Sequence, residues 1–220
     1  MLRREFNRSA VKAATLAGTA LLAPSLWAQG RPPTEGVDYL TLNKPASTEG
    51  LPGKIDVVEF FWYSCPHCNT FEPQLEVWLD KLPKNVNFRR MPVMFRPSFE
   101  PQQRLYYVIE ALGKVPELHK KVFNAIHGEK QTLDTVEQIT AWISKQGLDR
   151  AKFTELYNSF PVVTKARRAS QLQEQYQVDG VPSMGVAGRF FTSGSLAGNM
   201  PRVLQVVDHL IAQVAKGGKA

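Results

Sequence analysis

The feature that most constrains this chain is a pair of cysteines, Cys65 and Cys68, which are the only cysteines among its 220 residues. They flank Pro66 and His67 and follow a run of apolar, β-branched and aromatic residues from Ile55 to Trp62. Such a run is typical of a strand that is buried on both faces of a sheet. In the fold of this chain, a central strand must therefore end directly before the two cysteines.

A helix, a second strand and then several helices are expected after the cysteines. Apolar residues recur at helical spacing from Pro66 to Lys81, where Pro73 predicts a kink or a restart, and Asn85 to Pro92 is a second strand candidate. From Pro101 to Gln177 the pattern is helical, and glycines such as Gly113 stand where helices should end. The five helical patterns cover residues 102–113, 115–128, 135–147, 150–160 and 161–177.

The strand pattern returns near the C-terminus. Two short strands, Ser183 to Val186 and Arg189 to Thr192, flank a predicted hairpin turn at Ala187-Gly188. A last helix is expected from Met200 to Val214, with Asn199 as its N-cap.

These patterns predict an α/β protein whose small α/β domain is interrupted by an all-helical insertion. The expected segments are a signal peptide (1–28), a tether with a first strand at about Tyr39–Leu42 (29–53), the first part of the α/β domain (54–96), the helical insertion (97–177) and the second part (178–220). A mature chain of about 190 residues is long enough to bury a core without further crosslinks.

The N-terminus has the pattern of an export signal. Four basic residues among the first twelve precede a modestly apolar run from Ala13 to Ala23, and cleavage is expected after Ala28. The run is short and weakly apolar for a membrane span, although an uncleaved anchor is the alternative. Arg3-Arg4 resembles a twin-arginine signal but follows Leu2 rather than Ser or Thr, so the Sec and twin-arginine routes both stay open. Both lead out of the cytoplasm, and the expected location is a bacterial periplasm.

The charge of the chain gives little support for nucleic-acid binding. The formal net charge is +7, but without residues 1–28 the chain keeps 23 basic and 19 acidic side chains, a net charge of +4. The basic residues are scattered, and the pairs Arg89-Arg90 and Arg167-Arg168 are short. No basic stripe with interleaved aromatics is present, so nucleic acid is not an expected partner.

Four kinds of site share the C-x-x-C spacing. Haem attachment requires a histidine directly after the second cysteine, where this chain has Asn69. A structural zinc site requires four ligands, and His119, His127 and His209 lack ligand spacing, so no metal is expected. A structural disulfide across so short a loop would restrict the unfolded chain little. A redox-active dithiol fits best, because the strand–CxxC–helix context is the one this motif requires.

The predicted helix start favours a thiolate at Cys65. Free N–H groups and the helix dipole stabilise an anion there, and Pro66 at the first helical position loses no hydrogen bond. His67 can donate to the thiolate or pair with it when protonated; alternatively it is a solvated residue of the helix start. These effects stabilise the reduced form and not the neutral disulfide, so the pair should act as an oxidant.

Two further positions are candidates for the site. Glu59 lies within the buried strand, where a carboxylate is costly, and could relay protons under Cys68; an edge or solvent-facing position is the alternative. Val181-Pro182 opens a strand, and an ordinary trans turn is what the frequency of X-Pro bonds favours.

The stretch EFFWYSCPHC, the helical insertion and the sequence GVPS together resemble the DsbA family of thiol:disulfide oxidoreductases, which have a thioredoxin-like fold. The resemblance covers essentially the whole mature chain. Low thiol pKa values and oxidising couples are known properties of that family, so the thiolate expected at Cys65 is not independent of the resemblance.

The resemblance implies a role for each site residue. Cys65 would be the exposed nucleophile, Cys68 the resolving thiol and Glu59 the buried acid. Val181 and Pro182 would form a cis-proline loop that faces the disulfide and binds substrate backbone. The family's buried lysine partner of the acid has no clear counterpart, because Pro83 lies between the nearby Lys81 and Lys84.

The resemblance also implies partners, and it leaves alternative functions open. Reduced, unfolded exported proteins would be oxidised, and a quinone-linked membrane protein of the DsbB type would restore the disulfide without a bound cofactor. The stretch SGSLAGNM after Thr192 looks short for the groove that receives this reoxidant. A disulfide isomerase would need a dimerisation domain before Ile55 and usually Thr at the place of Val181, so a monomeric oxidase is expected. A reductase and a redox-inert peptide-binding chaperone also stay open.

Overall fold

The computed structural model describes residues 31–217, so the predicted signal peptide lies outside the described residues. A five-stranded sheet forms its centre, with the strands in the order β1-β5-β4-β2-β3. The strands are β1 (Leu40–Thr41), β2 (Ile55–Phe61), β3 (Val86–Pro92), β4 (Ser183–Val186) and β5 (Phe190–Ser193). Only β2 and β3 pair in parallel; the other neighbours are antiparallel.

Strand β2 is the buried centre that the sequence predicts. All seven of its residues are buried, and it pairs with β3 on one side and β4 on the other. Its side chains alternate between the two faces. Val57 packs in the core beneath one face, whereas Val58 and Phe60 pack in the core of the opposite face.

The hairpin between β4 and β5 turns at the predicted dipeptide. Ala187 and Gly188 have φ angles of 54° and 66°. Positive φ at both central residues is the geometry of a type I′ turn, whose twist matches that of the flanking strands. At Gly188 a side chain would also collide with the carbonyl oxygen of Ala46, so the turn requires glycine there.

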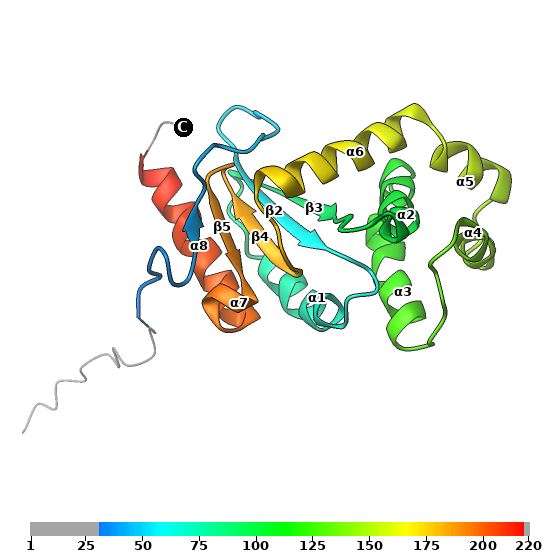
Figure 1. The fold of residues 1–220 in the computed structure, drawn as a ribbon, viewed down its shortest axis with the longest axis horizontal. Coiled ribbons are helices and arrows are strands. Elements are labelled where there is room, and N and C mark those ends of the chain that lie inside the picture. The colour runs from blue at the N-terminus through cyan, green and yellow to red at the C-terminus, as the bar shows by residue number, and fades with distance from the viewer. Residues whose placement is uncertain (1–30, 218–220) are drawn as a thin grey trace, which may run out of the picture. The chain divides into compact units, whose positions relative to one another are not determined.

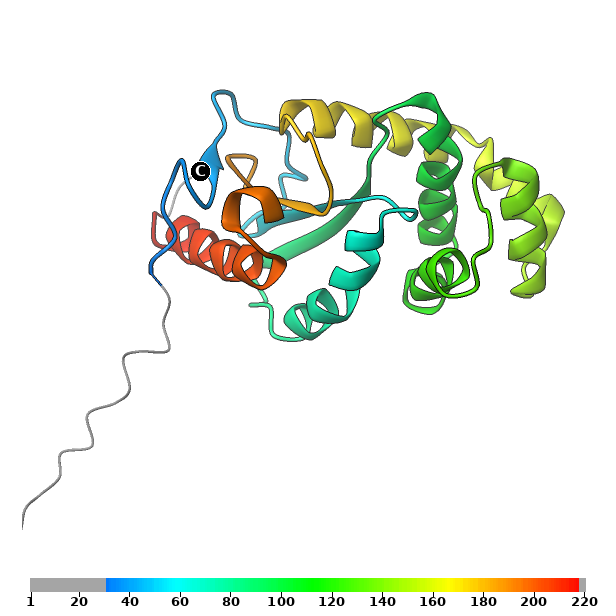
Figure 2. The same ribbon diagram turned by 60° about the horizontal axis from the view of Figure 1, so that its bottom comes forward.

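Helices cover both faces of the sheet and extend it at one end (Figures 1 and 2). Helices α1 and α8 cover the face that includes Val57, and α6 covers the face that includes Val58. Helices α2 to α5 lie beside the end of the sheet to which β2 points. The helices are α1 (Pro66–Leu79), α2 (Glu100–Ala111), α3 (Val115–His127), α4 (Val136–Lys145), α5 (Arg150–Tyr157), α6 (Phe160–Gln175), α7 (Gly194–Ala197) and α8 (Met200–Gly217), with a 3₁₀ turn at Pro97–Phe99.

Of the two outcomes predicted at Pro73, a kink or a restart, the restart does not occur, because helix α1 continues through this residue. The helix ends at Leu79 rather than Lys81. The predicted N-cap of α8 is confirmed, because Asn199 Oδ1 accepts a hydrogen bond from the Arg202 N–H at 2.8 Å.

The helices between β3 and β4 share one core with the end of β2. Phe61 and Tyr63 pack among buried residues of α2 and α3, in the same cluster as Cys65 and Cys68. The cysteines therefore lie where the helical segment meets the sheet; the boundaries at residues 97 and 177 stay a prediction. Within residues 31–217, no helix is long and apolar enough to cross a membrane.

Candidate active site

Cys65 is the N-cap of α1, as the sequence predicts. Its backbone is extended (φ −80°, ψ 116°), and its Sγ accepts a hydrogen bond from the Cys68 N–H at 3.4 Å. Pro66 begins the helix, where its missing N–H costs nothing. Both cysteines are free thiols, so the structure shows the reduced site.

The two sulfurs differ in accessibility, although less than expected. Cys65 is 7% exposed and Cys68 is fully buried. The prediction of an exposed Cys65 is therefore too strong: Cys65 is the more accessible of the two, but it is also buried. A reaction partner must approach Cys65 first, because Cys68 lies behind it in the core.

The environment separates the acidities of the two thiols. The pKa of Cys65 is lowered from 9.0 to about 6, chiefly by the hydrogen bond from the Cys68 side chain, with smaller help from the Cys68 and His67 N–H groups and the charge of His67. Burial raises the pKa of Cys68 well above its usual value, and the neighbouring Cys65 raises it further. At neutral pH the pair thus holds one negative charge, on Cys65.

His67 projects from the first turn of α1 and is exposed. It stabilises the Cys65 thiolate through its backbone N–H and its charge, but these are the smallest of the favourable causes. Both interpretations of this residue from the sequence therefore hold in part. It is a solvated helix-start residue that also contributes to the low pKa of Cys65.

The loop at Val181-Pro182 lies against the cysteine pair. The peptide bond is cis, and Cys65 Sγ lies 3.5 Å from the carbonyl oxygen of Val181. The prediction that this loop is cis and adjoins Cys65 is confirmed. Pro182 is buried and Val181 is partly exposed. Beside them Trp62 stacks on Phe99, with ring centroids 3.8 Å apart.

Glu59 is fully buried, which excludes an edge or solvent-facing position. Its Oε2 lies 3.3 Å from Arg90 Nε, but the two groups are not aligned for a hydrogen bond. Burial and the nearby Glu72 carboxylate raise the pKa of Glu59 to about 8, against the opposing effect of Arg90. The charge of Glu59 also helps to raise the pKa of Cys68, because a carboxylate there disfavours a nearby thiolate.

Arg90 is the basic partner that the sequence did not identify. It pairs directly across from Glu59 in the β2–β3 register, and it also contacts Glu72 at 3.2 Å and Glu76 at 2.9 Å. Lys81 and Lys84 form no ion pair with Glu59 within the described residues. The sequence pair Arg89-Arg90 could have indicated this partner. Adjacent residues of a strand face opposite sides of the sheet, so one of the two arginines had to lie on the same face as Glu59.

Glu72, His119 and Tyr63 extend this network and were also missed as site residues. His119 Nε2 lies 3.2 Å from Glu72 Oε1, and its Nδ1 lies 2.9 Å from the Tyr63 hydroxyl. Burial lowers the pKa of His119, which favours the neutral ring. Although burial opposes it, the contacts of Glu72 with His119 and Arg90 lower the pKa of this carboxyl and keep it ionised.

Comparison with known proteins gives a consistent result. The model of the DSBA-like thioredoxin domain family matches residues 56–201. A relative named thiol:disulfide interchange protein DsbA, from Bordetella parapertussis, is 44% identical over 93% of this chain and 95% of its own length. Another of that name, from Azotobacter vinelandii, is 39% identical over 94% and 97%.

Solved structures agree with the sequence relatives. The crystal structure of Pseudomonas aeruginosa DsbA has a TM-score of 0.80 and 37% identity, and it covers 85% of this chain and 97% of its own. The oxidoreductase NmDsbA1 from N. meningitidis has a TM-score of 0.74 and 26% identity, with 85% and 96% covered. The predicted thioredoxin-like α/β fold is confirmed.

Proposed function

This chain belongs to the family of DSBA-like thioredoxin domains and is a thiol:disulfide oxidoreductase, and from that premise we propose that it is a disulfide oxidase that donates its Cys65–Cys68 disulfide to reduced exported proteins. The family uses a redox-active cysteine pair rather than a bound cofactor. The observation that carries the proposal is the low pKa of Cys65, about 6, beside a buried Cys68.

The low pKa sets the direction of electron flow. The N–H groups of the helix start and the Cys68 thiol stabilise the Cys65 thiolate, whereas a neutral disulfide gains nothing from them. The reduced form is thereby favoured over the oxidised form. A disulfide whose reduction is favoured oxidises other thiols.

The exchange proceeds in two balanced steps. A client thiolate attacks Cys65 Sγ, a client–Cys65 disulfide forms, and the Cys65–Cys68 bond breaks with its electron pair on Cys68 Sγ. A second client thiolate then attacks the client sulfur, and Cys65 leaves as a thiolate. The client gains one disulfide and the protein becomes the dithiol. Cys65 is the sulfur attacked because Cys68 has no exposed surface.

Glu59 supplies the proton that Cys68 needs. The pKa of Cys68 is raised, so its thiolate must be protonated when the disulfide opens. With a pKa of about 8, Glu59 holds a proton at neutral pH and can release it towards Cys68, a transfer that reverses when the disulfide is restored. A carboxyl group with an ordinary pKa would carry no proton to give.

The Val181-Pro182 loop is the proposed client-binding element. The carbonyl oxygen of Val181 lies beside the reactive sulfur, and an extended client segment could pair with the Val181 backbone while its own sulfur meets Cys65.

We further propose that the chain works as a monomer in the periplasm, after removal of residues 1–28, and that a quinone-linked membrane protein of the DsbB type restores its disulfide.

The equilibrium with glutathione tests the proposal. The reduced and oxidised protein are separated after equilibration in glutathione buffers of known composition, and an oxidase should become reduced at low ratios of reduced to oxidised glutathione. A pair that stays oxidised under strongly reducing buffers would indicate a reductase or isomerase. A pair that does not exchange at all would indicate a redox-inert chaperone.

A further inference from the structure

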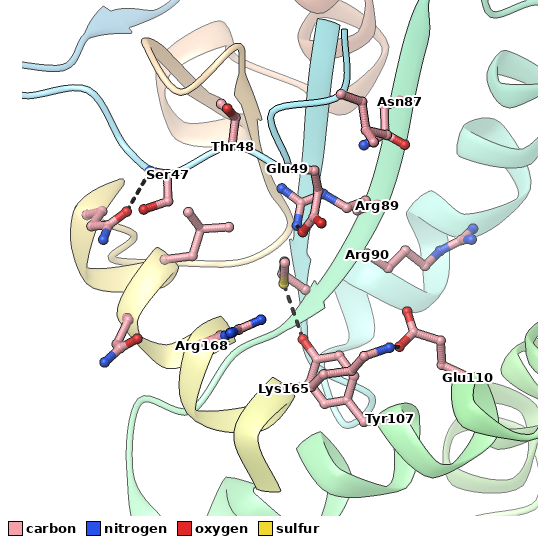
Figure 3. Close-up of a pocket in the computed structure, with 15 residues that line it drawn as sticks. Ser47, Thr48, Glu49, Asn87, Arg89, Arg90, Tyr107, Glu110, Lys165 and Arg168 are labelled. Atoms are coloured by element: carbon pink, nitrogen blue, oxygen red, sulfur yellow. Dashed lines mark hydrogen bonds and ion pairs between the residues drawn. The ribbon is translucent and has the colours of Figure 1, made fainter. Parts of the chain in front are cut away.

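A pocket lies on the face of the sheet that α6 covers (Figure 3). Its volume is about 580 Å³, which is in the range of sites that bind small organic molecules. The walls come from β3, α2, α6 and residues 47–51, and neither cysteine nor Val181 lines it. The pocket is therefore separate from the exchange site.

One face of α6 forms a wall of the pocket. Lys165, Arg168, Leu172 and Gln175 are spaced by three or four residues, so they lie on the same side of the helix. Figure 3 shows Arg168 on this wall, with Arg89 of β3 across from it. The two arginines face each other across the opening.

The charges in the pocket are unevenly matched. Arg89 pairs with Glu49 and lies 3.6 Å from Asp56, and Lys165 pairs with Glu110 at 2.6 Å. Arg168 pairs with no carboxylate in residues 31–217. A pocket with one unmatched guanidinium favours a ligand that carries a negative charge, since that charge completes the pairing.

The rest of the lining mixes apolar side chains with hydroxyl and amide groups. Met91, Leu172 and Tyr107 supply apolar surface, and the Tyr107 hydroxyl is already engaged by the Met91 sulfur at 3.2 Å. Gln175 accepts a hydrogen bond from the Ser47 N–H through its oxygen, so its amide NH₂ group can donate to a ligand. These surfaces suit a compact apolar body attached to the charged group.

We propose that this pocket binds a small organic carboxylate with an apolar or aromatic body. The guanidinium of Arg168 holds the carboxylate through paired N–H donors, a geometry that arginine provides and lysine does not. The apolar body lies against Met91 and Leu172. This site goes beyond the proposed disulfide exchange, because neither the cysteines, nor Glu59, nor the Val181-Pro182 loop lines it, although Arg90, the partner of Glu59, does.

Titration with hydrocinnamate tests the site, with hydrocinnamamide as the uncharged probe of the same shape. Amide ¹H–¹⁵N shifts of the oxidised protein are followed for the unchanged chain and for Arg168→Gln and Arg167→Gln. Arg167 is the matched control, because it is an exposed arginine of the same helix that does not line the pocket.

The expected result is saturable binding of hydrocinnamate with shifts centred on α6 and β3. Binding should weaken at least about tenfold in Arg168→Gln, as for loss of one charge-assisted hydrogen bond, and stay unchanged in Arg167→Gln. Hydrocinnamamide lacks the negative charge, so its affinity for the unchanged chain should be as low as the affinity of hydrocinnamate for Arg168→Gln. The proposal is overturned if Arg168→Gln binds as well as the unchanged chain, if the amide binds equally, if the shifts centre on the cysteines, or if no saturable binding occurs.

Discussion

The sulfur of Cys65 lies 3.5 Å from the carbonyl oxygen of Val181, a residue 116 positions further along the chain. This contact joins the start of α1 to the loop before β4, which comes from the other half of the sheet. The reactive thiol and the backbone that would hold a client therefore depend on the same tertiary fold. Because this backbone lies beside Cys65 and not beside the buried Cys68, a client held there meets the sulfur of Cys65.

We expect the two cysteines to behave differently in trapping experiments. A Cys68→Ser variant should accumulate mixed disulfides with unfolded clients that carry a disulfide, because the Cys65 thiolate attacks that disulfide, one client sulfur leaves as a thiolate, and no second thiol resolves the intermediate. A Cys65→Ser variant should accumulate almost none, since the remaining thiol is fully buried and its pKa is raised. Non-reducing electrophoresis measures both, and equal trapping by the two variants would contradict the assigned roles.

The reduced protein should be more stable than the oxidised protein, and increasingly so as the pH rises. The pKa of Cys65 is about 6 when folded and near 9.0 when unfolded, so its stabilisation is complete above pH 9 and is lost as the pH falls towards 6. The ionisation of Cys65 alone should stabilise the reduced protein by about 1 kcal/mol at pH 7 and about 3–4 kcal/mol at pH 9, where the raised pKa of Cys68 begins to oppose it. Denaturant unfolding of both forms at several pH values measures it. A more stable oxidised form would favour a reductase.

The cysteine site could be predicted from the sequence because its signals are local. The strand, the CxxC motif and the helix follow each other within residues 55–79, and Glu59 stands out as a carboxylate in an apolar strand. The position of the Val181-Pro182 loop needed more than local patterns, and it came from the resemblance to a known family.

The ionic network around Glu59 could not be predicted in the same way. Arg90 is identified as its partner only once the β2–β3 register is known, because a shift of one residue would bring Arg89 to that position. His119 belongs to α3, and its contact with Glu72 depends on how the helical segment docks on α1. The low exposure of Cys65 likewise depends on packing between distant segments, such as the contact with Val181.

We expect His67 to have a measurable but small effect on the thiol. His67→Leu should raise the pKa of Cys65 by less than about one unit, which corresponds to less than about 30 mV in the couple, because His67 is among the weaker causes of the shift. His67→Lys keeps a positive charge and should hold the pKa low. Thiolate absorbance against pH measures each variant. A rise well above one unit in His67→Leu would mean that the histidine, and not the Cys68 thiol, dominates.

Glu59→Gln should change the pH dependence of both rate and stability. The folded pKa of Glu59 is raised from 4.5 to about 8, so its contribution to stability is complete below pH 4.5 and is lost as the pH rises through 8. In the oxidised protein, where the cysteines do not titrate, the variant should lose less stability over that range. It should also donate its disulfide more slowly near pH 7, since glutamine cannot protonate Cys68. Unchanged rates together with an unchanged stability profile would exclude a role for Glu59.

Arg90→Met should destabilise the fold, because it removes the cation shared by Glu59, Glu72 and Glu76. Loss of one partner of a buried ion pair typically costs about 3–5 kcal/mol. Arg90→Lys keeps the charge and should recover part of that loss. Above pH 8, where Glu59 is ionised, Glu59→Gln should cost less in the Arg90→Met background than in the unchanged chain, since glutamine requires no countercharge. Urea unfolding of the two single variants and the double variant gives the coupling energy. A coupling near zero would show that Arg90 stabilises Glu72 and Glu76 alone, and that it does not offset the effect of burial on Glu59.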